Sequence, residues 1–304
     1  GLYKECEYRA HLMSASFDAD ILLTMRSLFL CSRYDEIHIY NAYLFTPFHI
    51  FLARLLGCHV VFYSHEPAKK GKYKSYGFQG AVKSTAVELI NKLSIMLAHK
   101  SFVFSPYALK LTQDSILLKL FSNKIYETRL LMPDPVVKNS SAVEPTVLFF
   151  GQLNKTKTPY WVTDFVQNSK FLQSGGKLKI LTGSLEYDFL DVLQRENPSK
   201  FEIERVQNLS DEKIECEIQK VIVTVHLHHC VCQSGAMVES YRNRVPIITL
   251  EAPGFSQFYD PDCMAMISAY SAEDLDNAIS KMVDLGSNGR ENAYQFYKKN
   301  FQTL

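Results

Sequence analysis

The sequence predicts an α/β fold with two domains, each built on a parallel sheet. Three observations support this prediction: the length of 304 residues, the alternation of short apolar strands with helices, and a proline-rich segment near the middle of the chain. A chain of this length is longer than a single hydrophobic core usually supports. Alternating strands and helices form parallel sheets, and ligands collect at the carboxyl ends of their strands. We therefore expect the functional site in a cleft between the two domains.

The first half of the chain carries the strand and helix pattern clearly. Short runs of β-branched and aromatic residues predict strands, and apolar residues at helical spacing predict helices. Gly57 is expected to end the first helix, and Pro106 to begin the last. The strands are predicted at residues 36–40, 59–63 and 101–104, and the helices at 48–56, 84–98 and 106–120.

The domain boundary is expected in segment 132–145, which holds three prolines and two adjacent serines. It divides the chain into residues 1–140 and 141–304. The same pattern then begins again, and no repeat of about 20 to 50 residues is visible, so the halves share architecture only. The second half has predicted strands at 146–150, 178–181, 201–205, 221–226 and 246–250, and predicted helices at 160–172, 187–196, 210–220 and 235–243.

Charge is distributed unevenly, although the net charge is only +1. Residues 1–140 hold 17 Lys and Arg against 11 Asp and Glu, and the remainder holds 16 against 21. A basic half favours an anionic partner, such as a membrane surface, a phosphate-bearing acceptor or nucleic acid. Charge alone does not choose among these partners.

Composition also bears on the compartment. The apolar stretches 19–31 and 49–63 are interrupted by Arg26 and Arg54, and they fall short of the roughly 18 to 20 clean residues of a spanning helix. No transmembrane segment is predicted. Seven cysteines without a repeating framework fit reduced thiols in the cytoplasm better than a disulfide-stapled domain.

Three segments resemble motifs of one enzyme family. Segment 147–157 (VLFFGQLNKTK) combines a strand, a glycine and a downstream lysine, segment 233–249 a helix and the strand after it, and segment 63–67 (YSHEP) a histidine loop after a strand. In this order they are similar to motifs of the family-4 retaining glycosyltransferases. The resemblance covers roughly residues 35 to 300. It implies the GT-B fold, with two facing Rossmann-like domains.

In that fold the first domain binds the acceptor and the second binds a nucleotide-sugar donor. The first strand and glycine-rich loop of the acceptor domain are not recognisable before Asp18. We therefore expect residues 1–140 to form an acceptor domain that is reduced or truncated at its start.

The start of the helix predicted at residue 235 suits a diphosphate on physical grounds. Its first N–H groups lack partners inside the helix, the helix dipole is positive there, and Gly235 permits close approach to the backbone. The alternative is an ordinary helix capped by Ser234. Glu239, one turn further on, is placed to accept hydrogen bonds from ribose hydroxyls. The alternative role for Glu239 is a solvated carboxylate on the helix surface.

The resemblance implies roles for individual residues. Catalytic roles fall to His65, which meets the transferred sugar and stabilises developing charge, and to Glu239, which matches the second of the family's paired glutamates. A lone histidine is more often structural. The expected donor-binding residues are Gly151, Gln152, Lys155, Lys157, Gly183, Val206, Asn208, Leu209, Gln233, Ser234, Gly235, Ala236, Met237 and Glu239.

Two positions depart from the family pattern. The first of the paired glutamates would lie at Val231, so a carboxylate that helps to hold the donor sugar in the family is missing. The family's arginine after the strand-ending glycine is Gln152 here. Lys157, with Lys155 as a possible substitute, is therefore expected to matter more for phosphate binding. The alternative for both lysines is a solvated loop.

Four lysines after the histidine loop are candidates for an anionic partner. They alternate with two tyrosines and are expected to contact an anionic membrane surface or the pyrophosphate of the acceptor. The alternative is a solvated loop. These residues are Lys69, Lys70, Lys72 and Lys74.

Two metal-like patterns are set aside. Asp18 and Asp20 match the acidic pair of metal-dependent glycosyltransferases of another fold. They precede an apolar helix, however, and aspartate is a common N-cap residue at that position. A second cluster has ligand types suited to zinc, but alternate strand residues point to opposite faces. It consists of His226, His228, His229, Cys230 and Cys232. No metal and no organic cofactor is expected.

The sequence thus predicts a metal-independent, hexosyltransferase-like retaining enzyme that transfers a sugar from a nucleotide diphosphate sugar to a saccharide or lipid-linked acceptor. Polysaccharide or glycolipid synthesis for the cell surface is the expected setting. We expect a cytoplasmic protein, peripheral on the inner face of the membrane, without a nucleic-acid partner. Two alternatives stay open: a nucleotide-sugar epimerase of the same fold, and a degenerate subunit that binds a donor or partner without turnover.

Overall fold

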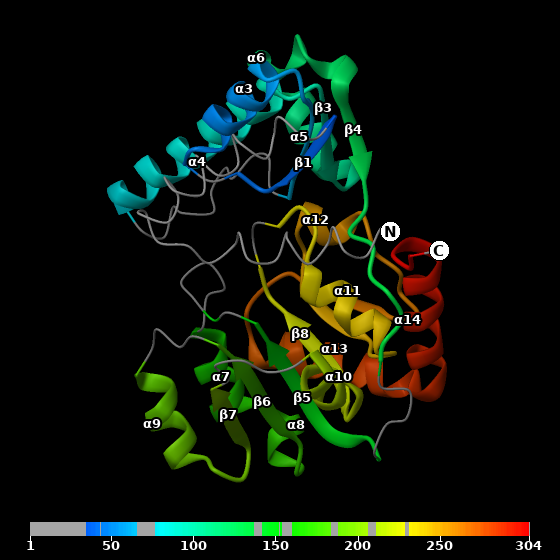
Figure 1. Cartoon of the computed structure of the whole chain (residues 1–304). Coiled ribbons are helices and arrows are strands. Elements are labelled where there is room, and N and C mark those ends of the chain that lie inside the picture. The colour runs from blue at the N-terminus through cyan, green and yellow to red at the C-terminus, as the bar shows by residue number, and fades with distance from the viewer. Residues whose placement is uncertain are drawn as a thin grey trace. The chain divides into compact units, whose positions relative to one another are not determined.

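The computed structural model describes residues 35–42, 44–65, 77–136, 142–151, 153, 160–183, 188–205, 211–228 and 231–303. They divide into two compact units, each with its own sheet. Figure 1 labels most of the helices and strands of both. The domain boundary predicted at residues 140–141 lies outside the described residues.

The first unit contains a sheet with the strand order β1-β2-β3-β4. β2 pairs in parallel with both β1 and β3. Parallel pairing follows from the helical crossovers between successive strands. The elements from β1 to β4 are β1 (Glu36–Tyr40), α3 (Thr46–Leu55), β2 (His59–Ser64), α4 (Gly77–Leu97), β3 (Lys100–Phe104), α5 (Pro106–Gln113), α6 (Ile116–Lys119), η3 (Ser122–Lys124) and β4 (Ile125–Thr128).

The second unit contains a parallel sheet with the strand order β10-β9-β8-β5-β6-β7. The order reverses beside β5, because the chain passes from β7 back to β8 on the other side of that strand. Its elements are β5 (Glu144–Phe150), α7 (Tyr160–Asn168), α8 (Lys170–Gln173), β6 (Lys177–Thr182), α9 (Phe189–Glu196), β7 (Phe201–Arg205), α10 (Asp211–Gln219), β8 (Val221–His226), α11 (Gly235–Arg242), β9 (Ile247–Leu250), α12 (Pro253–Ser256), β10 (Met264–Ile267), α13 (Ala272–Asp284) and α14 (Gly286–Asn300).

The core of the second unit lies on both faces of its sheet. Val147 and Phe149 of β5 pack in a cluster that includes side chains of α7 and α13. Leu148 and Phe150 point to the opposite face and pack in a cluster with Ile218 of α10. A continuous apolar run is typical of a parallel strand buried on both faces. This placement leaves the carboxyl ends of the strands for loops that can bind a ligand.

Two of the predicted helices are interrupted in the structure. The helix predicted at 106–120 ends at Gln113 and a new helix begins at Ile116, and the one predicted at 160–172 divides into α7 and α8. At the second break, the Ser169 side chain accepts a hydrogen bond from the Leu172 N–H. Asp276 of α13 accepts from both the Ser169 hydroxyl and the Lys170 N–H, each at 2.6 Å. The prediction of one helix was wrong because this partner is distant in the sequence.

Within the described residues, no helix combines the length and the apolar character that crossing a membrane requires.

Candidate functional site

The first turn of α11 lies beyond the carboxyl end of β8, as predicted. Ser234 is the N-cap, with its hydroxyl accepting a hydrogen bond from the Met237 N–H at 3.3 Å. The cap satisfies one of the N–H groups that have no hydrogen-bond partner within the helix at its start. A Cβ added at Gly235 would meet only the Leu130 Cδ2 atom, at 3.7 Å. Packing therefore does not require glycine there, whereas close approach of a ligand to the backbone would.

Gln233, immediately before this cap, has a buried amide that is half satisfied. Its Oε1 accepts a hydrogen bond from the Leu130 N–H at 3.1 Å, and the residue is 1% exposed. In the part of the chain that the structure describes, the buried Nε2 has no hydrogen-bond partner. A buried donor without a partner is costly and calls for an explanation. A ligand acceptor at the helix start would supply one.

The loop before α11 is held from two sides. The Cys232 carbonyl accepts hydrogen bonds from the Ser105 hydroxyl at 3.0 Å and from Gln257 Nε2 at 2.7 Å. A Cβ on Gly254 would lie 1.7 Å from the Val231 carbonyl oxygen, so only glycine fits against this loop. The Val231 side chain packs against the apolar cluster around α11. The position of the family's first glutamate is thus a packing position here.

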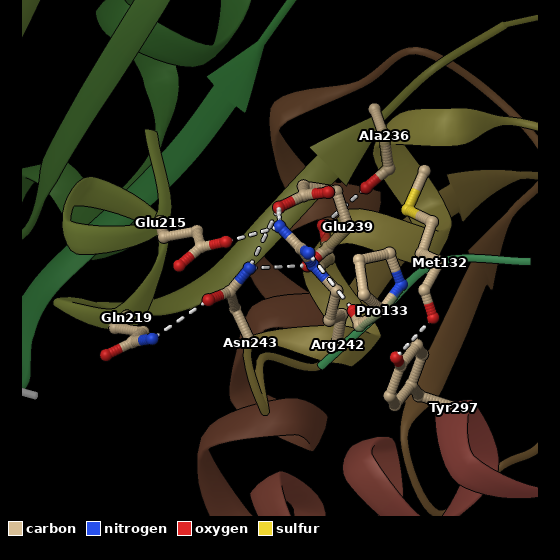
Figure 2. Close-up of polar contacts among 10 residues, drawn as sticks. Met132, Pro133, Glu215, Gln219, Ala236, Glu239, Arg242, Asn243 and Tyr297 are labelled. Carbon is tan, nitrogen blue, oxygen red and sulfur yellow. Dashed lines mark hydrogen bonds and ion pairs between the residues drawn. The ribbon is translucent and has the colours of Figure 1, made fainter. Parts of the chain in front are cut away.

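Glu239 lies one turn into α11 and belongs to a cluster of charged and amide groups (Figure 2). Its Oε1 is 2.6 Å from Arg242 Nη2 and accepts a hydrogen bond from Asn243 Nδ2 at 3.1 Å. The same Arg242 nitrogen donates to Glu215 Oε1 at 2.5 Å. Burial raises the pKa of Glu239, and the bond to Arg242 opposes that shift. The side chain remains 17% exposed, so a ligand can reach it.

Two glycines of the predicted site lie at the carboxyl edge of the same sheet. Gly151 follows β5 with a φ of 109° and donates its N–H to the Leu181 carbonyl at 3.0 Å. Gly183 follows β6. Because β8, β5 and β6 are neighbours in the sheet, their carboxyl ends bring both glycines to the same edge as the start of α11.

His65 lies in the first unit, directly after β2. Its backbone N–H donates to Asn41 Oδ1 at 3.3 Å. Asn41 follows β1 with a φ of 63°, a conformation that asparagine adopts more readily than most residues. The histidine therefore stands at the carboxyl edge of its sheet, where ligands of parallel sheets bind. Its contact with a sugar stays a prediction.

Several predicted site residues cannot be placed. Outside the described residues lie Gln152, Lys155, Lys157, Val206, Asn208 and Leu209, together with Lys69, Lys70, Lys72 and Lys74.

The two metal-like patterns are partly described. Asp18, Asp20, His229 and Cys230 lie outside the described residues. His226 Nε2 is 3.1 Å from the Ser240 hydroxyl, and its ring stacks on that of His228. Among the residues that the structure describes, no three His, Cys, Asp or Glu side chains are grouped to hold a metal ion.

Sequence reasoning missed the partners of the site residues. Arg242 stands three positions after Glu239, a spacing that places both side chains on one helix face, so this pair was detectable. Glu215 on α10 and Gln257 after α12 come from other elements. No local pattern signals them.

The structure has two sheets of parallel strands with flanking helices, and the candidate site lies at the carboxyl ends of the strands. These features define an α/β protein of the GT-B type. Comparison with protein-family profiles and with curated protein sequences gave no match. Comparison with solved structures gave matches.

HepE of Anabaena in complex with UDP-glucose superimposes with a TM-score of 0.68 at 12% identity, over 92% of this chain and 78% of that chain. Sucrose-phosphate synthase from Thermosynechococcus elongatus superimposes with a TM-score of 0.67 at 17% identity, over 88% of this chain and 70% of that chain. TarM superimposes with a TM-score of 0.69 at 13% identity, over 90% of this chain and 55% of that chain. The chain therefore has the GT-B fold of these glycosyltransferases, as the sequence predicted. A protein described as a UDP-N-acetylglucosamine 2-epimerase, from Listeria monocytogenes, is also similar, with a TM-score of 0.60 at 10% identity, over 94% and 79%.

Proposed function

We propose that the protein is a retaining glycosyltransferase whose second unit binds a nucleoside diphosphate sugar. One observation carries the proposal: beyond the carboxyl end of β8, the first turn of α11 lies between Gln233, whose buried Nε2 has no hydrogen-bond partner among the described residues, and the partly exposed carboxylate of Glu239. The first two are suited to a diphosphate and the third to ribose hydroxyls.

The diphosphate would bind the first turn of α11, at the backbone N–H groups of Gly235 and Ala236. Lys157, with Lys155, would add positive charge, and segment 206–209 would frame the base. Fixed N–H groups and cations aimed at the phosphates stabilise the charge that the leaving nucleoside diphosphate acquires. This arrangement needs no metal ion for that task.

His65 would meet the transferred sugar from the first unit. The acceptor is a saccharide or a lipid-linked saccharide, and the basic first half offers charge complementary to the phosphate groups of a lipid-linked one. Lys69, Lys70, Lys72 and Lys74 would bind the anionic part of such an acceptor or the inner surface of the membrane.

The epimerase alternative rests on the likeness to the Listeria protein, and the degenerate-subunit alternative rests on Val231 and Gln152, where the family's glutamate and arginine are missing. Incubation with donor alone separates the two activities. An epimerase converts the sugar or releases nucleoside diphosphate without acceptor, whereas a transferase requires acceptor. A degenerate subunit binds donor and does neither.

The proposed donor site is tested by thermal unfolding with a panel of nucleoside diphosphates, each matched with its nucleoside. A ligand at about 100 times its Kd adds roughly 2.7 kcal/mol to the free energy of unfolding. We expect a diphosphate to raise the Tm in the parent and to lose most of its effect in Glu239→Ala. The matched nucleoside, which lacks the phosphates, should raise it less. If no diphosphate raises the Tm, the donor assignment is wrong.

A further inference from the structure

Arg242 is fixed between two carboxylates in the cluster that contains Glu239 (Figure 2). Its Nη2 binds Glu215 Oε1 at 2.5 Å and Glu239 Oε1 at 2.6 Å. The two partners differ in burial: the side chain of Glu215 is 1% exposed and that of Glu239 is 17% exposed. Glu215 thus anchors the guanidinium from the protein interior, while Glu239 faces the accessible side.

Further contacts hold this arrangement. Arg242 Nη1 donates to the Pro133 carbonyl at 3.1 Å, which fixes the plane of the guanidinium. Asn243 Oδ1 accepts a hydrogen bond from Gln219 Nε2 at 2.9 Å, so the amide of Asn243 has one orientation. Asn243 Nδ2 therefore points at Glu239, where it donates to both the carbonyl and Oε1. The donors around Glu239 come from a rigid set of groups.

Both donors take the same oxygen of Glu239. Oε1 accepts from Arg242 and from Asn243, which uses its two lone pairs. Among the described residues, Oε2 takes part in no hydrogen bond. The carboxylate is consequently oriented through Oε1 and offers Oε2, with two lone pairs, to a ligand. Two vicinal hydroxyl groups are donors that fit such an oxygen.

We propose that Arg242 is a positioning residue that aims Glu239 Oε2 at the ribose hydroxyls, so that the site selects ribonucleoside over 2′-deoxyribonucleoside diphosphates. The inference rests on the proposed donor site. Loss of one hydroxyl leaves the oriented, partly buried oxygen with one donor fewer, and a hydrogen bond to a charged group is among the stronger ones. Donor sugars carried on ribonucleotides are then the substrate class of the enzyme.

The test measures by calorimetry the ratio of Kd for a 2′-deoxynucleoside diphosphate to Kd for its ribo form. The probes are UDP, GDP and ADP, each paired with its 2′-deoxy analogue. For the base that binds, we expect the parent to favour the ribo form about 10- to 100-fold. In Glu239→Gln and in Arg242→Met the ratio should fall to about threefold or less. A purely structural role would change stability and leave this ratio as it is.

Two further variants keep the test decisive. Removing Arg242 takes an ion-pair partner from the buried Glu215 carboxylate, a change that can unfold a protein. The double variant Arg242→Met with Glu215→Gln removes both charges, and it should fold and still lack discrimination. Arg244→Met is the matched control, since Arg244 is 52% exposed and pairs with Glu291. It should keep the parent ratio.

The outcomes separate the two proposals. If none of the six nucleotides binds the parent, the proposed function is wrong. If a ribonucleotide binds and its deoxy form binds equally well, or if the arginine variants keep the ratio that Glu239→Gln loses, the positioning role of Arg242 is wrong and the donor site stands.

Discussion

The side-chain amide of Gln257 donates a hydrogen bond to the Cys232 carbonyl at 2.7 Å, and so ties the end of α12 to the loop that opens α11. The same nitrogen donates to the Gly254 carbonyl at 2.9 Å, and Gln257 Oε1 accepts from the Tyr107 N–H at 2.8 Å. Together with Ser105, this side chain holds the loop that carries Gln233. Its removal should affect ligand binding through that loop.

Gln257→Met is therefore expected to weaken nucleoside diphosphate binding severalfold and to lower the free energy of unfolding by about 1 to 3 kcal/mol, because three hydrogen bonds are lost. Calorimetry and urea denaturation measure the two effects. The control is Gln302→Met, since the hydrogen bond from Gln302 to Asp134 is exposed and lies away from this loop in the sequence. Unchanged binding in a folded Gln257→Met protein would show that the loop holds its shape without this residue.

Two glycine substitutions should separate stability from binding. Gly254→Ala places a Cβ 1.7 Å from the Val231 carbonyl oxygen, so the loop must shift and the Tm should fall. Gly235→Ala places one 3.7 Å from the nearest side-chain atom, an ordinary contact, and should leave the Tm of the free protein nearly unchanged. Under the proposed function it should still weaken diphosphate binding by blocking close approach. Equal loss of Tm in both variants would contradict this packing account.

Glu239→Ala and His65→Ala should impair different properties of the enzyme, the first ligand binding and the second turnover. Glu239 is proposed to hold the nucleotide before and during transfer, so its loss should weaken diphosphate binding by about 1 to 3 kcal/mol. His65 is proposed to act on the reacting sugar, so its loss should lower kcat and spare diphosphate affinity. Calorimetry and steady-state turnover measure both. A normal kcat in His65→Ala would remove the histidine from the mechanism.

Chelation should leave turnover largely intact, because a helix start and Lys157 are proposed to neutralise the leaving diphosphate. Activity is compared with and without EDTA, and Lys157→Ala should reduce both activity and the diphosphate-induced rise in Tm. Activity that EDTA abolishes and manganese or zinc restores would favour the acidic pair Asp18 and Asp20 or the histidine and cysteine cluster.

His99 should make the first unit less stable in acid. Its Nδ1 accepts a hydrogen bond from the Val60 N–H at 2.9 Å, which requires the unprotonated ring. Burial first, and the Arg54 charge second, lower the pKa of His99 below its usual 6.5. The unfolded chain then binds the proton more readily, so stability is full above about pH 6.5 and is lost as pH falls toward the lowered value. Urea denaturation at several pH values should show a weaker pH dependence in His99→Gln than in the parent.

Much of the fold was accessible from the sequence because its signals are local. Apolar runs such as 146–150 and 221–226 predicted strands, and Ser234-Gly235 predicted the start of α11. These assignments depend on residues within one or two helical turns of each other, which is the range over which caps and periodicity act. The same local reasoning placed Glu239 on the helix and Gly151 at a strand end. It did not predict β4, β10 or the break at Ser169.

What only the tertiary structure decided is which groups complete the site. Glu215 and Arg242 stand 27 positions apart in sequence, and Gln257 and Cys232 stand 25 apart. Each pair joins elements of different βα units, and the packing of those units is set by the whole core rather than by either neighbourhood. Residue types and spacing could therefore name the carboxylate of Glu239. Only the packed fold determined that Glu215 binds Arg242 and that Gln257 binds the loop before Gln233.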